Sequence, residues 1–83
     1  MREQERQAYE KILSLFAHKN DDFHFPMALT MLAQLDIMEG RFEDARARLD
    51  RAEQENEQHR NPVVFFLVKD LRDKLPPTGQ AEG

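Results

Sequence analysis

Two histidines and two aspartates lie between positions 18 and 24, and imidazole and carboxylate groups are ligands that proteins use for divalent metals. They are His18, Asp21, Asp22 and His24. A stable site needs about four ligands on a rigid frame, whereas we expect these residues on a helix end and a loop, with no second cluster nearby. We therefore predict no metal site and no cofactor.

Nucleophilic catalysis finds little support among the remaining residues. The chain has no cysteine, and its one serine, Ser14, falls within an ordinary helical pattern. No G-x-S-x-G, phosphate-cradling glycine loop or H-E-x-x-H motif is present, and the carboxylates are spread as surface charge. The sequence predicts a protein that is not an enzyme.

Four arginines between positions 41 and 51 raise the question of nucleic-acid binding. Each basic position has acidic neighbours at helical spacing, and the formal net charge of -4 would repel phosphate backbones. We expect a solvated, salt-bridged helix face and no nucleic-acid partner. The expected pairs are Asp44 with Arg48, Arg46 with Asp50, and Arg51 with Glu55.

The length of 83 residues allows one small domain, which we place at residues 1–75, followed by a flexible tail at 76–83. Because 40% of the residues are hydrophobic and are regularly spaced, the composition is globular rather than disordered. The longest apolar run, residues 63–68, is too short for a signal peptide or a membrane span. These features predict a cytoplasmic protein with no membrane association.

Helical periodicity predicts an all-α fold of about four helices in antiparallel hairpins. The expected helices span residues 2–19, 27–39, 41 to 59 or 60, and 64–75. Pro26 suits a first helical turn, Gly40 a helix end, and Asn61-Pro62 a capped helix start. The fourth segment begins with strand-forming residues, but we favour a helix because a lone strand would have no partner.

Two features leave alternatives open. The third helix has no apolar residue beyond Ala52, so its last two turns either project into water, contact a polar partner surface or fray. In the fourth helix, six consecutive apolar residues cannot share one face, so Val63 or Phe66 should be exposed. That apolar surface is either an interface or is covered by the loop that carries Phe23 and Phe25.

The second and third helices together resemble a tetratricopeptide repeat. The match includes Gly40 at the turn and small residues such as Ala33 and Ala45, which let two helix backbones approach closely, while Asp36 replaces the family's usual aromatic residue. The resemblance implies a TPR-like array with an inward, ligand-facing surface. The residues implied there are Met27, Thr30, Gln34, Ile37 and Met38.

Methionine-rich surfaces adapt to apolar side chains of a bound peptide, although the same residues also suit the core of a central helix. We take as candidate partner-binding residues the five on the second helix together with Val63 and Phe66. The leading hypothesis is a non-enzymatic module, such as an adaptor, chaperone or assembly subunit, which binds another protein, a peptide or a second copy of itself. The alternative is a peptide-sensing or regulatory segment of a larger signalling or transcription-control protein.

Overall fold

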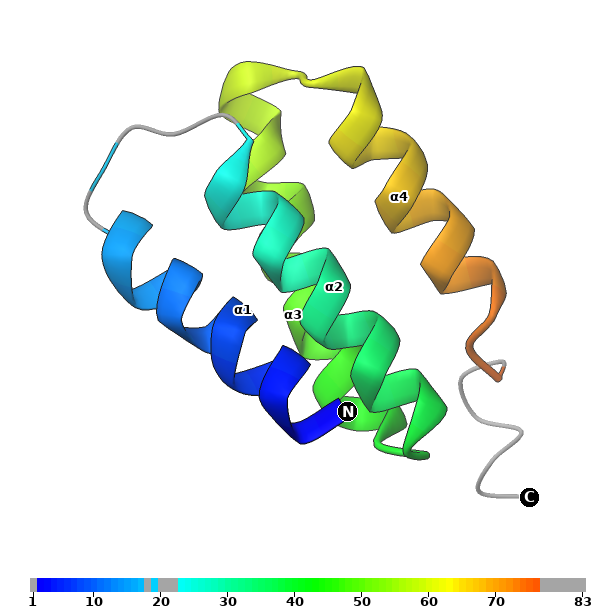
Figure 1. Cartoon of the computed structure of the whole chain (residues 1–83). Coiled ribbons are helices and arrows are strands. Elements are labelled where there is room, and N and C mark those ends of the chain that lie inside the picture. Colours follow the sequence, from blue (N-terminus) through cyan, green and yellow to red (C-terminus); the bar gives the residue numbers. More distant parts are fainter. Residues whose placement is uncertain (1, 18, 20–22, 77–83) are drawn as a thin grey trace.

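The computed structural model describes residues 2–17, 19 and 23–76, which form four helices and, within those ranges, no strand. Helix α1 comprises Arg2–Phe16, α2 His24–Met38, α3 Phe42–His59 and α4 Pro62–Asp73. Helices α2 and α4 run in one direction, and α1 and α3 run in the other (Figure 1). The predicted all-α fold with hairpin-like helix packing is confirmed.

The start of α2 lies three residues before the predicted one, at His24 rather than Met27. Pro26 nevertheless occupies the first turn, where its missing N–H would have no intrahelical partner. At the other end, Gly40 adopts a positive φ of 79°. The Arg41 N–H donates to the Asp36 carbonyl at 2.7 Å and the Gly40 N–H to the Ile37 carbonyl at 3.1 Å, which is a Schellman helix end.

The junction between α3 and α4 is held by two asparagines. Asn56 is buried, and its side chain both donates to the Asn61 carbonyl at 3.0 Å and accepts from the Asn61 N–H at 2.8 Å. Asn61 in turn caps α4, because its Oδ1 accepts from the Val63 N–H at 2.9 Å. The last turns of α3 therefore remain helical and pack against the start of α4, and the predicted fourth helix is confirmed.

Helix α2 is the centre of the fold, because it contacts each of the other three helices (Figure 1). Its partner in the core is α3, where Ala45, Leu49 and Ala52 are fully buried at helical spacing. The apolar residues of α4 that complete this core are Val64, Val68 and Leu71. Helix α1 lies at one edge and α4 at the opposite edge of the array (Figure 1).

A buried ion-pair cluster fastens α1 to the other helices. The Arg6 guanidinium lies 2.9 Å from one carboxylate oxygen of Asp36 and 3.0 Å from Glu39, and Arg48 of α3 lies 2.9 Å from the other Asp36 oxygen. Burial opposes the charge of Arg6, but hydrogen bonds and attraction to Asp36 and Glu39 outweigh it and raise the pKa of Arg6 above its ordinary value. Three helices therefore meet at one neutralised carboxylate.

The predicted salt-bridged face of α3 is correct in one pair and wrong in two. Arg51 pairs with Glu55 at 3.1 Å, as expected. Arg48 instead binds Asp36, and Arg46 binds Glu43 at 2.8 Å and the Pro76 carbonyl at 2.7 Å. For Arg48 the pair with Asp36 on α2 replaces the expected pair with Asp44, and a buried carboxylate such as Asp36 is less screened by water than an exposed one. Arg46 instead pairs within α3, three residues away rather than four.

Two further expectations concern the ends and the surroundings of the domain. Pro76 is tied to α3 through Arg46, whereas the rest of the expected tail, residues 77–83, lies outside the described residues. Across the described ranges, none of the helices has both the length and the apolar character needed to cross a membrane.

Candidate functional site

The five residues expected to face a partner from α2 do not all share one accessible face. Thr30 is fully buried, and its hydroxyl donates to the Met27 carbonyl at 2.7 Å, so its side chain is not on the accessible surface where the resemblance placed it. Ile37 is half-buried and packs against the core. Met38 is 51% exposed and Gln34 is exposed, while Met27 is half-buried.

The accessible stripe of α2 contains a methionine that was not among the expected partner residues. Met27, Met31, Gln34 and Met38 follow one another at steps of four, three and four, which places them on one side of the helix. Thr30 and Ile37 lie to one side of this stripe, and Thr30 faces the interior. The helical spacing alone could have identified Met31, but not which side of α2 the other helices leave open.

The largest exposed apolar side chains belong to α4. Val63, Phe65 and Phe66, which we call the aromatic edge, are 49%, 56% and 64% exposed. The two phenylalanine rings meet edge to face, with centroids 5.5 Å apart. The prediction that Val63 or Phe66 is exposed is confirmed for both. The alternative, in which the loop carrying Phe23 and Phe25 covers these side chains, is wrong, because all three side chains of the aromatic edge are exposed. Phe25 belongs instead to the buried core.

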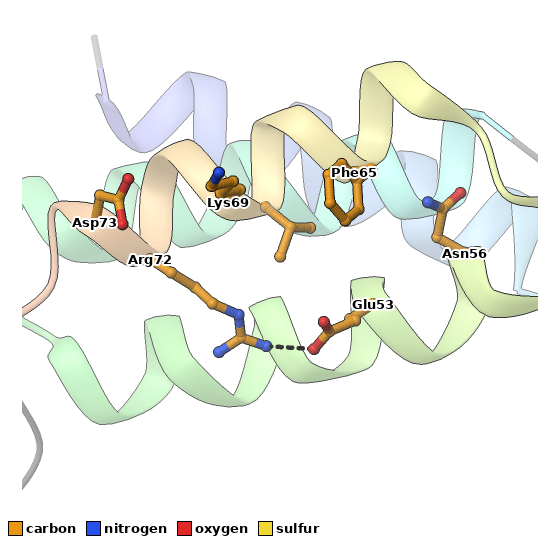
Figure 2. Close-up of a pocket in the computed structure, with 7 residues that line it drawn as sticks. Glu53, Asn56, Phe65, Lys69, Arg72 and Asp73 are labelled. Carbon is orange, nitrogen blue, oxygen red and sulfur yellow. Dashed lines mark hydrogen bonds and ion pairs between the residues drawn. The ribbon is translucent and has the colours of Figure 1, made fainter.

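A groove between α3 and α4 begins beside Phe65. One part of this groove, which we call the Arg72 hollow, has a volume of about 220 Å³, and Figure 2 shows Arg72 of α4 reaching toward Glu53 of α3 across it. The Arg72 guanidinium crosses the groove to reach Asp50 and Glu53, each at 2.8 Å. The hollow is lined by Glu53, Asn56, Phe65, Val68, Lys69, Arg72 and Asp73.

The electrostatics of this hollow are set by one arginine shared between two carboxylates. The pKa of Arg72 is raised above its ordinary value, mainly by the hydrogen bond to Asp50. Burial lowers the pKa, but the hydrogen bond and the negative charge of Glu53 raise it further. The arginine is therefore fixed as a cation that joins α3 to α4. Lys69, on the α4 wall, makes no ion pair among the described residues.

A second, wider hollow continues the groove past Phe65 toward the α3–α4 turn. This Arg60 hollow has a volume of about 630 Å³. It shares Glu53, Asn56 and Phe65 with the Arg72 hollow and adds Glu57, Arg60, Pro62 and Phe66. The lining therefore combines the apolar side chains of Pro62, Phe65 and Phe66 with the charged side chains of Glu53, Glu57 and Arg60. Sequence reasoning missed this groove, because it depends on how α4 lies against α3.

Reactive constellations are not assembled in the described part of the chain. Of the four residues considered as metal ligands, His24 stacks on Phe16 with ring centroids 4.7 Å apart, and the other three lie outside the described residues. Among the residues described, no group of three or more His, Cys, Asp or Glu side chains is placed to hold a metal ion. The buried carboxylate of Asp36 is occupied by its two arginines.

No protein-family model matches the chain, and neither the curated proteins nor the solved structures include a significant match to it.

Proposed function

We propose that this chain is a non-enzymatic protein-interaction module that binds a partner, either a different protein or a second copy of itself, through the aromatic edge and the groove beside it. The observation that carries the proposal is the exposure of Phe65 and Phe66, at 56% and 64%, on neighbouring positions of a helix at the edge of the fold. Burying a phenylalanine side chain contributes about 1.5 to 3 kcal/mol, so two adjacent ones supply a substantial anchor.

The surroundings of the aromatic edge support the same proposal. Interfaces typically combine an aromatic centre with a polar rim, and here the two rings adjoin a groove whose rim carries Glu57, Arg60 and Lys69. Helix α4 offers these rings from a rigid element, because Val64, Val68 and Leu71 anchor its other face in the core. A partner can therefore bind without reordering the helix.

The kind of module that we infer is a TPR-like adaptor, chaperone or assembly subunit acting in the cytoplasm. This part of the proposal is supported by the antiparallel α2–α3 pair with its close-packed alanines, and by α4, which runs parallel to α2 and packs on both helices (Figure 1). The accessible methionine stripe of α2 is a second apolar surface on which a peptide could lie.

Site-specific photo-crosslinking tests the proposal directly. We would place a benzoylphenylalanine at position 66 and, as a matched control, at position 15, since Leu15 is an apolar residue of similar exposure, 57%, on the opposite edge. We expect protein adducts from position 66 that are absent from position 15. Equal adducts from both positions, or none from position 66, would contradict the proposal. The mass of the adducts would also show whether the partner is a regulatory protein, a client or a second copy.

A further inference from the structure

Two opposite charges that line the Arg60 hollow have no ion-pair partner in the part of the chain that the structure describes. Glu57 and Arg60 both border the hollow, yet neither makes an ion pair with any described residue. The other arginines of α3 and of its preceding turn each have a carboxylate within 4.0 Å. An exposed acid and an exposed base beside the aromatic edge form a surface that is complementary to itself.

Self-complementarity of this kind matches an isologous interface, in which residue i of one copy meets residue j of the other and the reverse contact also forms. The apolar part of the surface has the same property. Phe66 projects from α4 with 64% of its surface exposed, and together with Phe65 and Pro62 it forms the apolar part of the lining of the hollow of about 630 Å³. A phenylalanine from a second copy is chemically suited to that lining.

We propose that the occupant of the Arg60 hollow is a second copy of this chain, related by a two-fold axis close to Phe66. Phe66 of each copy enters the hollow of the other, and Glu57 of each copy pairs with Arg60 of the other. The inference rests on the proposed function and names its partner. A two-fold axis at this point also leaves the charged second half of each α4 in solvent.

The backbone at Arg60 provides a diagnostic substitution. Arg60 ends α3 with a positive φ of 53°, and its N–H donates to the Asn56 carbonyl at 2.6 Å. Glycine adopts this conformation with less strain than arginine, so Arg60→Gly should leave the folded monomer at least as stable while it removes the rim charge. A loss of pairing in this variant cannot then be assigned to unfolding.

Sedimentation equilibrium of the purified chain, from micromolar to millimolar concentration, tests the proposal with helicity measured in parallel. We expect a reversible monomer–dimer equilibrium. Phe66→Glu should abolish the dimer and keep the helical signal, whereas Leu15→Glu, at a similarly exposed apolar site on α1, should leave the dimer unchanged. A wild-type chain that is monomeric throughout, or a dimer that survives Phe66→Glu, would overturn the proposal.

Charge reversal tests the two ion pairs. Because each reversal acts twice in a symmetric dimer, Glu57→Arg and Arg60→Glu should each raise the dimer Kd on the order of ten-fold, and the double variant should restore it. Arg60→Gly should raise the Kd without lowering the Tm. A double variant no tighter than the singles, or wild-type pairing in Arg60→Gly, would show that these residues are outside the interface and overturn the arrangement.

Sedimentation and photo-crosslinking together separate this inference from the proposed function. A monomeric chain that still forms adducts with a different protein from position 66 overturns the second copy as the occupant and leaves the interaction module standing. A monomeric chain with no adducts from position 66 overturns both.

Discussion

The guanidinium of Arg6 in α1 lies 2.9 Å from the carboxylate of Asp36 in α2, and both side chains are almost completely buried. Among the described residues of α1, Arg6 alone is buried, whereas Leu13 and Phe16 are only partly buried. The attachment of α1 therefore combines a buried ion pair with apolar contacts that are only partly buried. Removing one partner of a buried pair is more damaging than replacing both, because the remaining charge stays buried.

We expect Arg6→Met to lower the free energy of unfolding by about 2 to 3 kcal/mol. This loss is no larger than the smallest losses usual for a broken buried pair, because Arg48 still neutralises Asp36 in the variant. Urea unfolding followed by helicity measures the change. Arg2→Met, in the exposed first turn of the same helix, is the control and should have little effect. A loss as small as that of the control would mean that α1 is held by its apolar contacts.

The contribution of Arg6 should not change between neutral and mildly alkaline pH. The pKa of Arg6 is raised in the folded chain, so its contribution to stability is complete below the unfolded pKa and is lost only as the pH rises through the folded value, in strongly alkaline solution. The difference in unfolding free energy between wild type and Arg6→Met should therefore be equal at neutral pH and at pH about 9. If this difference in unfolding free energy became smaller between neutral pH and pH about 9, the raised pKa of Arg6 would be contradicted.

The helices could be predicted because local signals mark their ends. Gly40 takes the positive φ expected at a helix end, and Asn61 with Pro62 caps and starts α4. The Arg6–Asp36–Arg48 cluster could not be predicted in the same way. Charged residues at helical spacing have the same pattern whether they face water or each other, and only the packing of three helices brings these side chains together.

The candidate site was predictable in part for the same reason. Six consecutive apolar residues cannot share one face of a helix, so exposure of Val63 or Phe66 follows from the sequence. The groove beside Phe65 does not follow, because its α3 wall consists of polar residues such as Glu53 and Asn56. Thr30 was placed on the ligand-facing surface by the resemblance to a tetratricopeptide repeat, whereas in the structure its side chain is fully buried.

Asn56 is expected to hold α3 and α4 together. Asn56→Ala removes two hydrogen bonds and leaves the N–H and carbonyl of Asn61 without these partners, so we expect a loss of about 2 kcal/mol. Thermal unfolding followed by circular dichroism would measure the change. Gln58→Ala, at an exposed position of the same helix, serves as the control. If the two variants were equally stable, the Asn56 bridge would contribute nothing beyond an exposed side chain.

Gly40 should be sensitive to substitution through its backbone alone. A Cβ at this position would meet nothing within 4 Å, so no clash contributes, but φ is 79°. We expect Gly40→Ala to destabilise the chain by about 1 to 2 kcal/mol and Gly40→Asn by less, because asparagine tolerates the left-handed region better. Chemical denaturation of the three proteins gives the order, and an alanine variant as stable as the asparagine variant would contradict it.

Ile37 and Met38 are neighbours in sequence with different surroundings, and serine substitution should separate them. Ile37 packs against the core, so Ile37→Ser removes apolar contacts and should lower the unfolding free energy by about 2 kcal/mol. Larger losses occur where the truncated side chain is fully buried, whereas Ile37 is only half-buried. Met38 is 51% exposed, so Met38→Ser should change it by less than about 0.5 kcal/mol. Urea unfolding of both variants tests the difference. Because Met38→Ser leaves the fold intact, any loss of peptide binding in that variant would report on the methionine stripe itself. Equal destabilisation by the two substitutions would instead mean that Met38 is covered in solution and that the stripe is not free to bind.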